Sequence, residues 1–335
     1  MPGHQLPPWR QPGWISHTTA WMDAALAGAG RRRTGPVEQP RVRPWSTVLS
    51  APTDAGMVYL KTTAPATAND AGITALLSDV APAMVVRPLA IDVAQRLILL
   101  PHGGSLMREV VSGDAEVGHW KRLMPRYAEL QRGLTSQTDG LLAAGALDRR
   151  LDGLVAQYRE LVEDPDQHAG TNPHGLEPDE LARLRDLEQR FGAACAELAA
   201  MSIGESIQHD DLHSANVLLD DGSYRILDWG DASVTHPFGT LLVTLRSVAM
   251  HAGLAEDDGA LRALRDAYLE PWTGLASRAE LLRAVELATW VGLAVRGLIW
   301  RAALQAADAD ELAEWRDAVP DALRMLLKRV PAPAP

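Results

Sequence analysis

The spacing of hydrophobic residues changes along the chain and divides it into two parts. Up to Leu100, short apolar runs alternate with turn residues, which is the pattern of β-hairpins. The strands expected from these runs are Trp45–Ser50 and Met57–Lys61, then Leu89–Val93 and Arg96–Leu100. One helix is expected between the two hairpins, at about Ala66–Leu77, and another before them, at Thr18–Ala27.

Beyond residue 104 the hydrophobic period becomes helical. Apolar residues at three- and four-residue spacing predict helices over Trp120–Leu134, Leu151–Val162 and Pro178–Met201, and again from about Gly239 to Leu327. The segment 163–177 is rich in Pro, Asp, His and Gly and is expected to be a loop. Residues 1–16, rich in Pro and Trp, are expected to form an irregular arm.

A third hairpin interrupts the helical part. Val217–Leu219 and Tyr224–Leu227 flank Asp220-Asp221-Gly222, whose Asp-Gly step is a strong tight-turn signal. Asn216 precedes the first strand and Asp228 follows the second, so the hairpin brings the two side chains together. Oxygen-bearing side chains at one point suit a hard cation such as Mg²⁺.

Asp211 adds a third chemical group to this hairpin. It lies five residues before Asn216, the spacing that protein kinases use between the catalytic base and a metal-binding Asn. Phosphoryl transfer is therefore the favoured chemistry. Two alternatives stay open: a zinc site of His209 and His213, four residues apart, and a buried polar hairpin without chemistry. The strand-and-turn pattern that follows argues against the helix on which the zinc site depends.

Two motifs around this hairpin resemble the aminoglycoside phosphotransferase family, which is similar to choline and homoserine kinases. That family commonly shows His-Gly-Asp-Leu-His-x-x-Asn and then Ile-Asp-Trp, where this chain has His-Asp-Asp-Leu-His-Ser-Ala-Asn at 209–216 and Leu-Asp-Trp at 227–229. The resemblance implies these roles: catalytic base for Asp211, loop support for His209, and Mg²⁺ ligands for Asn216 and Asp228. The position occupied by Asp210 is Gly in the family motif.

The resemblance implies a two-lobed, protein-kinase-like α+β fold with ATP in the cleft between the lobes. Three segments are expected: an N-terminal arm with a short helix (1–35), a nucleotide-binding N-lobe (36–104) and a mainly helical C-lobe (105–330). The N-lobe has a small antiparallel sheet and one helix, and it ends in the hinge. The catalytic loop 209–216 and Asp228 belong to the C-lobe. No P-loop is present, and no Gly-x-Gly-x-x-Gly follows a strand, which argues against P-loop and Rossmann folds.

Lys61 is the expected ATP-binding lysine of the N-lobe. Kinase-like proteins carry such a lysine on the third strand and pair it with an acid on the following helix. Asp70 is the candidate partner, although Asn69-Asp70 is equally typical of a helix cap.

Two further pairs of residues are candidates for ATP contacts. Ser46 and Thr47 are expected near the phosphates, with a plain strand position as the alternative. Leu100 and His102 belong to the expected hinge around Pro101–Gly104, whose backbone would contact adenine and whose glycines would allow the lobes to move.

Composition narrows the class of partner. A net charge of −11 disfavours nucleic acid and suits a cationic acceptor. The single cysteine, Cys195, excludes an internal disulfide and fits a reducing cytoplasm, and no secretory signal is evident. The most apolar helix, 281–304, carries four charged residues and is expected to be buried in the larger lobe and not in a membrane.

The acceptor is the least defined part of the expected reaction: an aminoglycoside, another sugar and an amino alcohol all remain open. The acids and aromatic residues available to bind it are Asp231, Glu256, Asp257, Asp258, Glu270, Trp272, Trp290 and Trp300. Thr240 stands where many relatives have an Asp that braces the catalytic loop. A catalytically weak, nucleotide-binding regulatory protein is therefore the alternative function.

Overall fold

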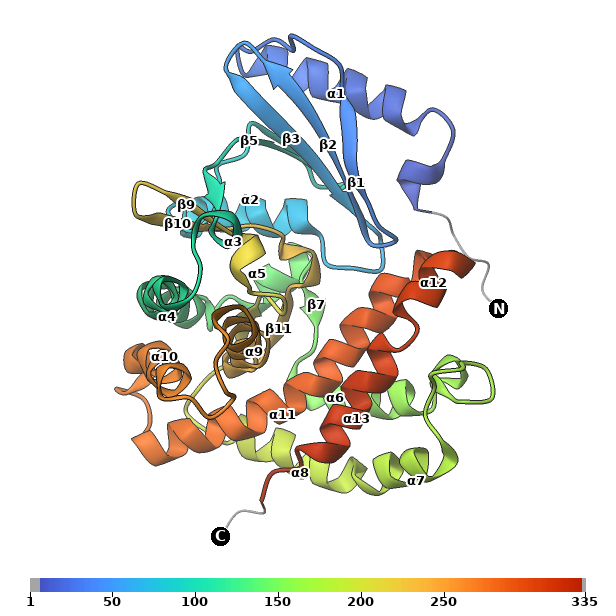
Figure 1. Ribbon diagram of the computed structural model, residues 1–335, viewed down its shortest axis with the longest axis vertical. Helices are drawn as coiled ribbons and strands as arrows, with labels where there is room; N and C mark the ends of the chain where they lie inside the picture. Colours follow the sequence, from blue (N-terminus) through green and yellow to red (C-terminus); the bar gives the residue numbers. More distant parts are fainter. Residues whose placement is uncertain (1–6, 333–335) are drawn as a thin grey trace.

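A computed structural model describes residues 7–332, and the first six residues of the expected arm lie outside this range. The chain forms two lobes, a sheet-rich one at the top of Figure 1 and a helical one below it. The sheet of the N-lobe has five antiparallel strands in the order β1-β2-β3-β5-β4. Its strands are β1 Glu38–Val42, β2 Ser46–Thr53, β3 Gly56–Thr63, β4 Ala90–Asp92 and β5 Leu97–Pro101.

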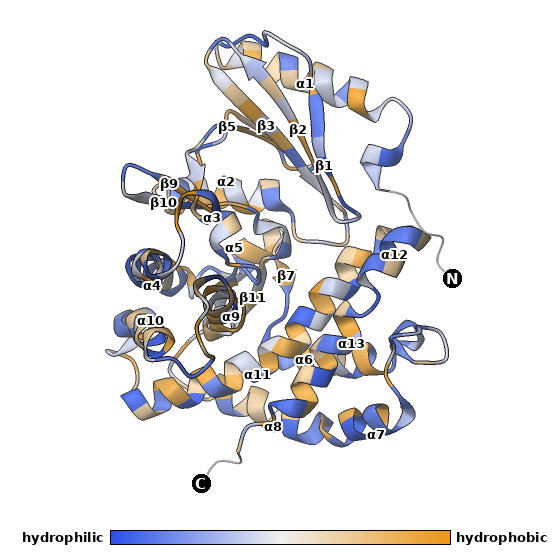
Figure 2. Ribbon diagram, in the orientation of Figure 1, coloured by the Kyte–Doolittle hydropathy of each residue, from blue (hydrophilic) through white to orange (hydrophobic). Residues whose placement is uncertain are grey.

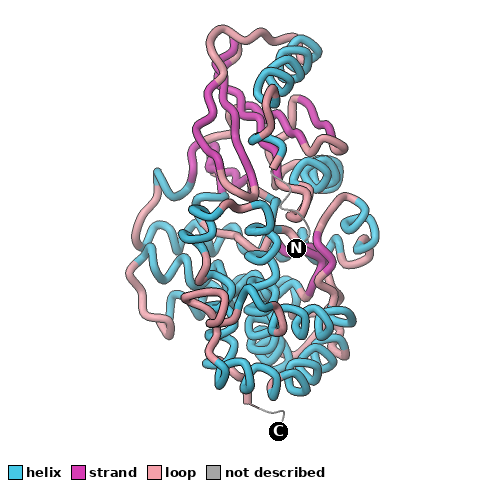
Figure 3. Tube along the Cα trace, turned by 90° about the vertical axis from the view of Figure 1, so that its right-hand side faces the viewer, coloured by secondary structure: helices cyan, strands magenta, loops and turns pink. Residues whose placement is uncertain are grey.

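The two faces of this sheet have different partners. Helix α1 (Trp14–Gly28) packs Met22 and Leu26 against alternate residues of β2, β3 and β5, including Leu49 and Leu60. Figure 3 shows α1 beside the strands. Because side chains alternate along a strand, Lys61 points to the opposite face. Helix α1, within the expected 1–35 segment, thus packs against the sheet of the N-lobe.

Helix α2 (Asp70–Val80) begins four residues later than the hydrophobic period suggested. Asn69 ends the preceding loop, because its side chain accepts a hydrogen bond from the N–H of Gly72 at 3.3 Å. Asn69 is therefore the cap, and Asp70 is left in the first turn with its carboxylate available for Lys61.

The C-lobe is built around one long helix, α11, whose N-terminus is capped by Ser277 and Glu280. The segment 278–306 is long and apolar enough to cross a membrane, but 78% of its most apolar window is buried inside the lobe. Figure 2 shows apolar residues recurring along α11, which contacts other helices of the lobe. The helices are α3 Met107–Val110, α4 Asp114–Leu134, α5 Thr138–Ala143, α6 Leu151–Val162, α7 Pro178–Asp186, α8 Glu188–Ala199, α9 Thr240–Ala252, α10 Gly259–Leu269, α11 Arg278–Ala303, α12 Ala309–Trp315 and α13 Ala318–Lys328. The single helix expected over 178–201 is two, with a break at Leu187.

Two small sheets lie between the five-stranded sheet of the N-lobe and the helices of the C-lobe. The expected hairpin is present, with Asp221 and Gly222 both at positive φ, 44° and 79°, as a two-residue hairpin turn of this kind requires. The strands are β6 Ser105–Leu106, β7 Leu147–Asp148, β8 Ser206–Gln208, β9 Val217–Asp220, β10 Ser223–Ile226 and β11 Ser233–Thr235. The short 3₁₀ turns are η1 Pro8–Arg10, η2 Pro165–Gln167, η3 Ser214–Asn216, η4 Trp229–Asp231, η5 Pro237–Gly239, η6 Glu270–Trp272 and η7 Leu304–Ala306. Strands β6, β7, β8 and β11 are too short to give a periodic signal.

The hinge is packed tightly against the hairpin. After β5, strand β6 pairs with β9, and Arg225 donates a hydrogen bond to the carbonyl of Gly103 at 3.1 Å. Gly104 has φ of 125°, and a Cβ there would lie 2.5 Å from the carbonyl oxygen of Leu219. The glycines expected to give the hinge freedom are thus needed for close packing.

Gly72 generates a testable prediction about the position of α2. A Cβ at Gly72 would lie 2.2 Å from the carbonyl oxygen of Ala144. We expect Gly72→Ala to lower the free energy of unfolding by about 1–3 kcal/mol, because overpacking outweighs the gain of about 1 kcal/mol in helix propensity. Urea denaturation measures the change.

Gly140 in α5 provides the matched control, since a Cβ there has nothing within 4 Å. Gly140→Ala is expected to leave stability unchanged or to raise it by up to about 1 kcal/mol. Equal effects of the two substitutions would contradict the prediction.

Candidate active site

The catalytic loop 209–216 follows β8 and is held from two sides. Tyr127 of α4 accepts a hydrogen bond from the N–H of His209 at 3.0 Å. Thr244 of α9 donates to the carbonyl of Leu212 at 2.9 Å. These two residues brace the loop, although Thr240 replaces the Asp that the resemblance associates with bracing. Local spacing does not indicate these contacts, because they join the loop to helices far away in the chain.

His209 is buried and connects the loop to the end of β10. Its Nε2 donates to the carbonyl of Leu227 at 2.8 Å, and its Nδ1 accepts from the N–H of Asp211 at 3.3 Å. Burial lowers the pKa of the imidazole, which agrees with a neutral ring. The Nδ1 of His213 accepts from Ala215 at 3.2 Å. Both ring nitrogens of His209 and Nδ1 of His213 thus form hydrogen bonds, and Nε2 of His213 lies 3.1 Å from Asp211. This geometry does not favour the zinc alternative.

Asp210 occupies a backbone conformation that favours glycine. Its φ is 63°, which explains physically why a Gly suits this position of the motif. The side chain is buried and accepts hydrogen bonds from Gln208 and Ser233. Burial raises the pKa of Asp210 to about 7, despite these two bonds.

Both carboxylate oxygens of Asp211 have partners. Oδ1 lies 3.2 Å from Nη2 of Arg296, and Oδ2 lies 3.1 Å from Nε2 of His213. Asn216 Nδ2 is 3.4 Å from Oδ2. Burial raises the pKa of Asp211, but Arg296 and His213 outweigh it and hold the pKa well below its usual range. The carboxylate therefore stays ionised.

Asn216 and Asp228 meet as the hairpin predicted. The N–H of Leu227 donates to the carbonyl of Asn216 at 2.9 Å, which joins the two strand ends. Asn216 donates its amide N–H to the carbonyl of Asp211 at 2.9 Å, which leaves its side-chain oxygen for a cation. An amide oxygen beside a carboxylate fits Mg²⁺, which proteins bind through few protein ligands together with phosphate oxygens.

Lys61 forms a buried ion-pair network between the lobes. Its Nζ lies 2.6 Å from Oδ2 of Asp70 and also contacts Oδ1 of Asp228. Asp70 Oδ1 accepts from the N–H of Trp229 at 3.1 Å. Burial lowers the pKa of Lys61, but the two carboxylates outweigh it and raise the pKa above its usual value. For Asp228, Lys61 likewise outweighs burial, and the pKa of that carboxyl is lowered.

Asp211 and Asp228 both line a small cavity between the lobes, which is about 80 Å³ in volume. It is lined by Arg41, Trp45, Ser46, Thr63, Thr67, Asp211, Asp228, Gly230, Asp231, Arg296, Ile299, Trp300 and Ala303. Ser46 is 2% exposed, and its hydroxyl has no hydrogen-bond partner within residues 7–332. Thr47, by contrast, donates to the carbonyl of Arg41 at 2.8 Å and has a structural role in the strand. Of the two candidates, only Ser46 is available for phosphate.

Two arginines in this cavity were not expected from the sequence. Arg41 of β1 lies 3.8 Å from Asp228, and Arg296 of α11 contacts Asp211. Nothing in the local pattern distinguishes them from surface arginines. Asp231 also lines the cavity, and burial, followed by the nearby Asp211, raises the pKa of Asp231 to about 7.

The hinge candidates lie at the edge of the N-lobe. Leu100 pairs with Tyr59 in the sheet, and the N–H of His102 donates to the carbonyl of Met57 at 3.0 Å. The N–H of His102 is therefore not free for adenine, and Pro101 has none. The adenine contact expected from the backbone of this segment would therefore use other groups than these two, and it stays a prediction.

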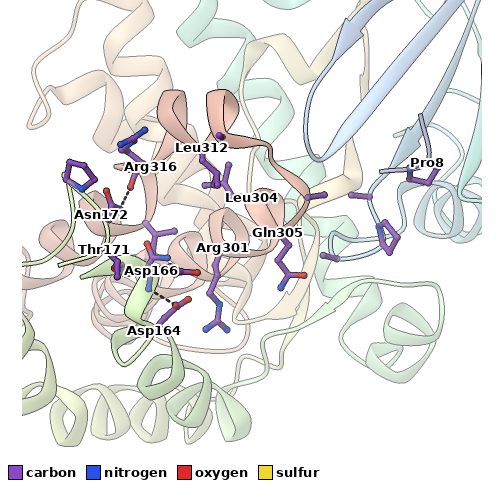
Figure 4. A pocket seen from close by; sticks show the side chains of 18 of the residues that line it. Pro8, Asp164, Asp166, Thr171, Asn172, Arg301, Leu304, Gln305, Leu312 and Arg316 are labelled. Carbon is purple, nitrogen blue, oxygen red and sulfur yellow. Dashed lines mark hydrogen bonds between the residues drawn. The ribbon is translucent and has the colours of Figure 1, made fainter. Parts of the chain in front are cut away.

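A second, larger cavity of about 1090 Å³ lies beside the first (Figure 4). The same two segments line both cavities: Thr67 and Ala303 line the small one, and Ala66 and Leu304 the large one. The polar side chains around the large cavity include Asp164, Asp166, Asn172, Arg301, Gln305 and Arg316. Glu256, Asp257, Asp258 and Glu270 line neither of the two, and Trp272 and Trp290 are buried in the core.

Three tryptophans form a contact between the two lobes, next to both cavities. The ring of Trp45, from the loop before β2, lies 5.6 Å from that of Trp300 and 5.7 Å from that of Trp315. Trp300 and Trp315 are stacked at 5.2 Å. Arg10 adds an ion pair with Asp308 at 2.9 Å.

A catalytic-loop Asp, an Asn and an Asp at a hairpin base, and a strand Lys paired with a helix acid form the arrangement that the family resemblance implies. Residues 128–281 match the model of the phosphotransferase enzyme family. The predicted family resemblance is confirmed. No curated protein matches this chain.

Solved structures share the two-lobed, kinase-like fold. A macrolide 2'-phosphotransferase from Brachybacterium faecium is 19% identical over 90% of this chain and 98% of that one, with a TM-score of 0.53. A choline kinase from Streptococcus pneumoniae is 13% identical over 94% and 99%, with a TM-score of 0.60. An amicoumacin kinase in complex with AMP-PNP, Ca²⁺ and Ami is 13% identical over 96% and 97%, with a TM-score of 0.57. Identities this low show the shared fold alone, and the α+β, kinase-like fold is confirmed.

Asp210 generates a prediction about pH and stability. The folded protein keeps the proton of Asp210 up to about pH 7, whereas the ordinary value for Asp is 3.8, so stability is lost as the pH rises between these values. Asn has no such proton to lose. We expect Asp210→Asn to raise the free energy of unfolding at pH 8 by about 1–3 kcal/mol relative to the wild type, with a smaller difference at pH 4.5.

Denaturant titrations at the two pH values measure this difference. Asp221→Asn, in the exposed turn of the hairpin, serves as the control, and its difference from the wild type should be the same at both pH values. A difference between Asp210→Asn and the wild type that is the same at pH 4.5 and pH 8 would show that Asp210 is ionised throughout.

Proposed function

We propose that the protein transfers the γ-phosphate of ATP, with Mg²⁺, to a hydroxyl group of a small molecule. The observation that carries this proposal is that Asp211, Asp228 and the unpartnered hydroxyl of Ser46 line one small cavity, with Lys61 bound to Asp228 and Asn216 bound to Asp211. Structures of the same fold have been solved with AMP-PNP and with ADP.

Each residue has one task in the proposed reaction. Asp211 orients the acceptor hydroxyl and accepts its proton as the oxygen attacks phosphorus. Lys61 and Ser46 hold the phosphates in line. Asn216 and Asp228 would hold Mg²⁺, which supplies positive charge to offset the phosphate oxygens. His209 positions the loop and keeps Asp211 in place.

The larger cavity is the proposed acceptor site. Its arginines, Arg301 and Arg316, are balanced by Asp164 and Asp166, and about half of its lining residues are apolar. A volume of about 1090 Å³ exceeds what a small amino alcohol fills. We therefore favour a large, mainly apolar hydroxyl compound over the polycation that the net charge of the chain suggested. The single, buried Cys195 fits the further proposal of a cytoplasmic enzyme.

The test is ADP release from Mg-ATP in the presence of a panel of macrolides, aminoglycosides, other sugars and amino alcohols. We expect release that depends on an acceptor. Asp211→Asn should lower kcat by about 100-fold or more while nucleotide binding persists, because the base is lost but the phosphate contacts remain. Tight nucleotide binding with no release for any acceptor would favour the regulatory alternative.

Ser46 provides a second prediction at the same site. Ser46→Ala removes the proposed phosphate donor without opening a cavity, so the KM for ATP should rise about three- to ten-fold. The acceptor KM should stay constant. An unchanged KM for ATP would indicate that Ser46 is only a strand residue, and Thr53→Ser at the far end of the same strand is the control.

Leu312 of α12 tests the acceptor site, because it lines the larger cavity and not the smaller one. Leu312→Trp fills that space, so the acceptor KM should rise about ten-fold or more while the KM for ATP does not change. Glu314→Trp places the same side chain on an exposed face of α12 and should leave both constants unchanged. Equal KM values for the two variants would show that the acceptor binds elsewhere.

A further inference from the structure

Arg296 contacts the catalytic loop at two points and Asp231 beyond it. Its Nη1 donates to the carbonyl of Asp210 at 3.0 Å. Its Nη2 lies 3.2 Å from Oδ1 of Asp211, and Nη1 lies 3.7 Å from Oδ2 of Asp231. The guanidinium is positioned 5.3 Å from the ring centre of Trp300.

Both carboxylate oxygens of Asp211 have partners, although each oxygen can accept more than one hydrogen bond. Oδ2 is engaged by His213 and Asn216, and within residues 7–332 Oδ1 is engaged by Arg296 alone. An acceptor hydroxyl must donate its hydrogen to one of these oxygens if Asp211 is the base. Oδ1 has the fewer partners, and the positive charge of Arg296 beside it makes the carboxylate a weaker proton acceptor, so withdrawal of Arg296 would strengthen the base.

Arg296 has a second anion site within reach. It lines the same small cavity as Ser46 and Asp228, where the proposed function puts the phosphates. A terminal phosphate carries more negative charge than one carboxylate and offers several acceptor oxygens to a planar guanidinium. Nη2 can leave Asp211 by side-chain rotation while Nη1 stays bonded to the Asp210 carbonyl.

We propose that Arg296 exchanges Asp211 for the terminal phosphate of the nucleotide. In the free protein Arg296 covers Oδ1 of the base; with nucleotide bound it holds the phosphate and uncovers that oxygen for the acceptor hydroxyl. Binding is then ordered, with nucleotide before acceptor. This inference rests on the proposed function, and it assigns a specific task to a residue that the kinase-like motifs do not include.

A double-mutant cycle on nucleotide affinity tests the exchange without using activity. Isothermal titration calorimetry with Mg²⁺ and AMP-PNP gives Kd for the wild type, Arg296→Met, Asp211→Asn and the double variant. We expect Arg296→Met to weaken binding about five-fold or more, because a charged phosphate contact is lost. Asp211→Asn should tighten binding about five-fold in the wild-type background, since Arg296 no longer has a pair to break.

The sign of the coupling decides between exchange and a static pair. If Arg296 exchanges partners, Asp211→Asn tightens binding less in the Arg296→Met background, about two-fold, because only charge repulsion is removed there. If Arg296 stays on Asp211, removing the arginine exposes the carboxylate charge. Asp211→Asn then tightens binding more in the Arg296→Met background, and the proposal is overturned.

Two further variants protect the test against folding effects. Arg296→Lys keeps the charge but cannot hold the Asp210 carbonyl and a phosphate together, so its Kd should lie between those of the wild type and Arg296→Met. Arg278→Met, about 27 Å away along α11, breaks an exposed pair with Asp266 and should bind like the wild type. Nucleotide binding by the wild type with no loss in Arg296→Met overturns the exchange alone. No nucleotide binding by the wild type overturns the proposed function itself.

Discussion

The buried ion-pair network of Lys61 is the interaction on which the site depends. One ammonium group lies between Asp70 on the first turn of α2 and Asp228 at the end of β10, so it joins the two lobes at the phosphate site. Removing Lys61 would leave the buried carboxylate of Asp70 without its ion-pair partner, which is strongly destabilising. The network is costly as a source of stability, and its value is that it fixes the position of Lys61 relative to Asp228, the proposed metal ligand.

The same constraint explains the local structures around it. Asn69 caps α2, and this leaves Asp70 free to accept from both Lys61 and Trp229. The tight approach of Gly72 to the Ala144 carbonyl sets how far α2 can move. On the other side, His209 connects the catalytic loop to Leu227, the residue before Asp228. The base, the metal ligands and the lysine are thus positioned by one continuous set of contacts.

The lobes are also joined outside this network. The tryptophans Trp45, Trp300 and Trp315 pack together across the cleft, and Arg10 pairs with α12. These contacts come from the ends of the described chain and lie beside both cavities. Their closeness agrees with the small volume of the inner cavity, and it places α12 in contact with Trp45 of the N-lobe and with Arg10.

The sequence by itself determined the hairpin, its Asp-Gly turn, and the meeting of Asn216 with Asp228, because these features depend on residues within about twenty positions of one another. The motifs at 209–216 and 227–229, through their resemblance to the aminoglycoside phosphotransferase family, predicted the two-lobed fold, which is confirmed, and phosphoryl transfer, which is the proposed chemistry. The start of α2 was misjudged because a cap decides it, and a hydrophobic period does not report caps. Only the tertiary structure brings Arg41 to Asp228 and Arg296 to Asp211. It also places Tyr127 and Thr244 against the catalytic loop and forms the larger cavity. The physical reason is that these contacts join elements separated by many residues, where neither spacing nor composition specifies which side chains meet.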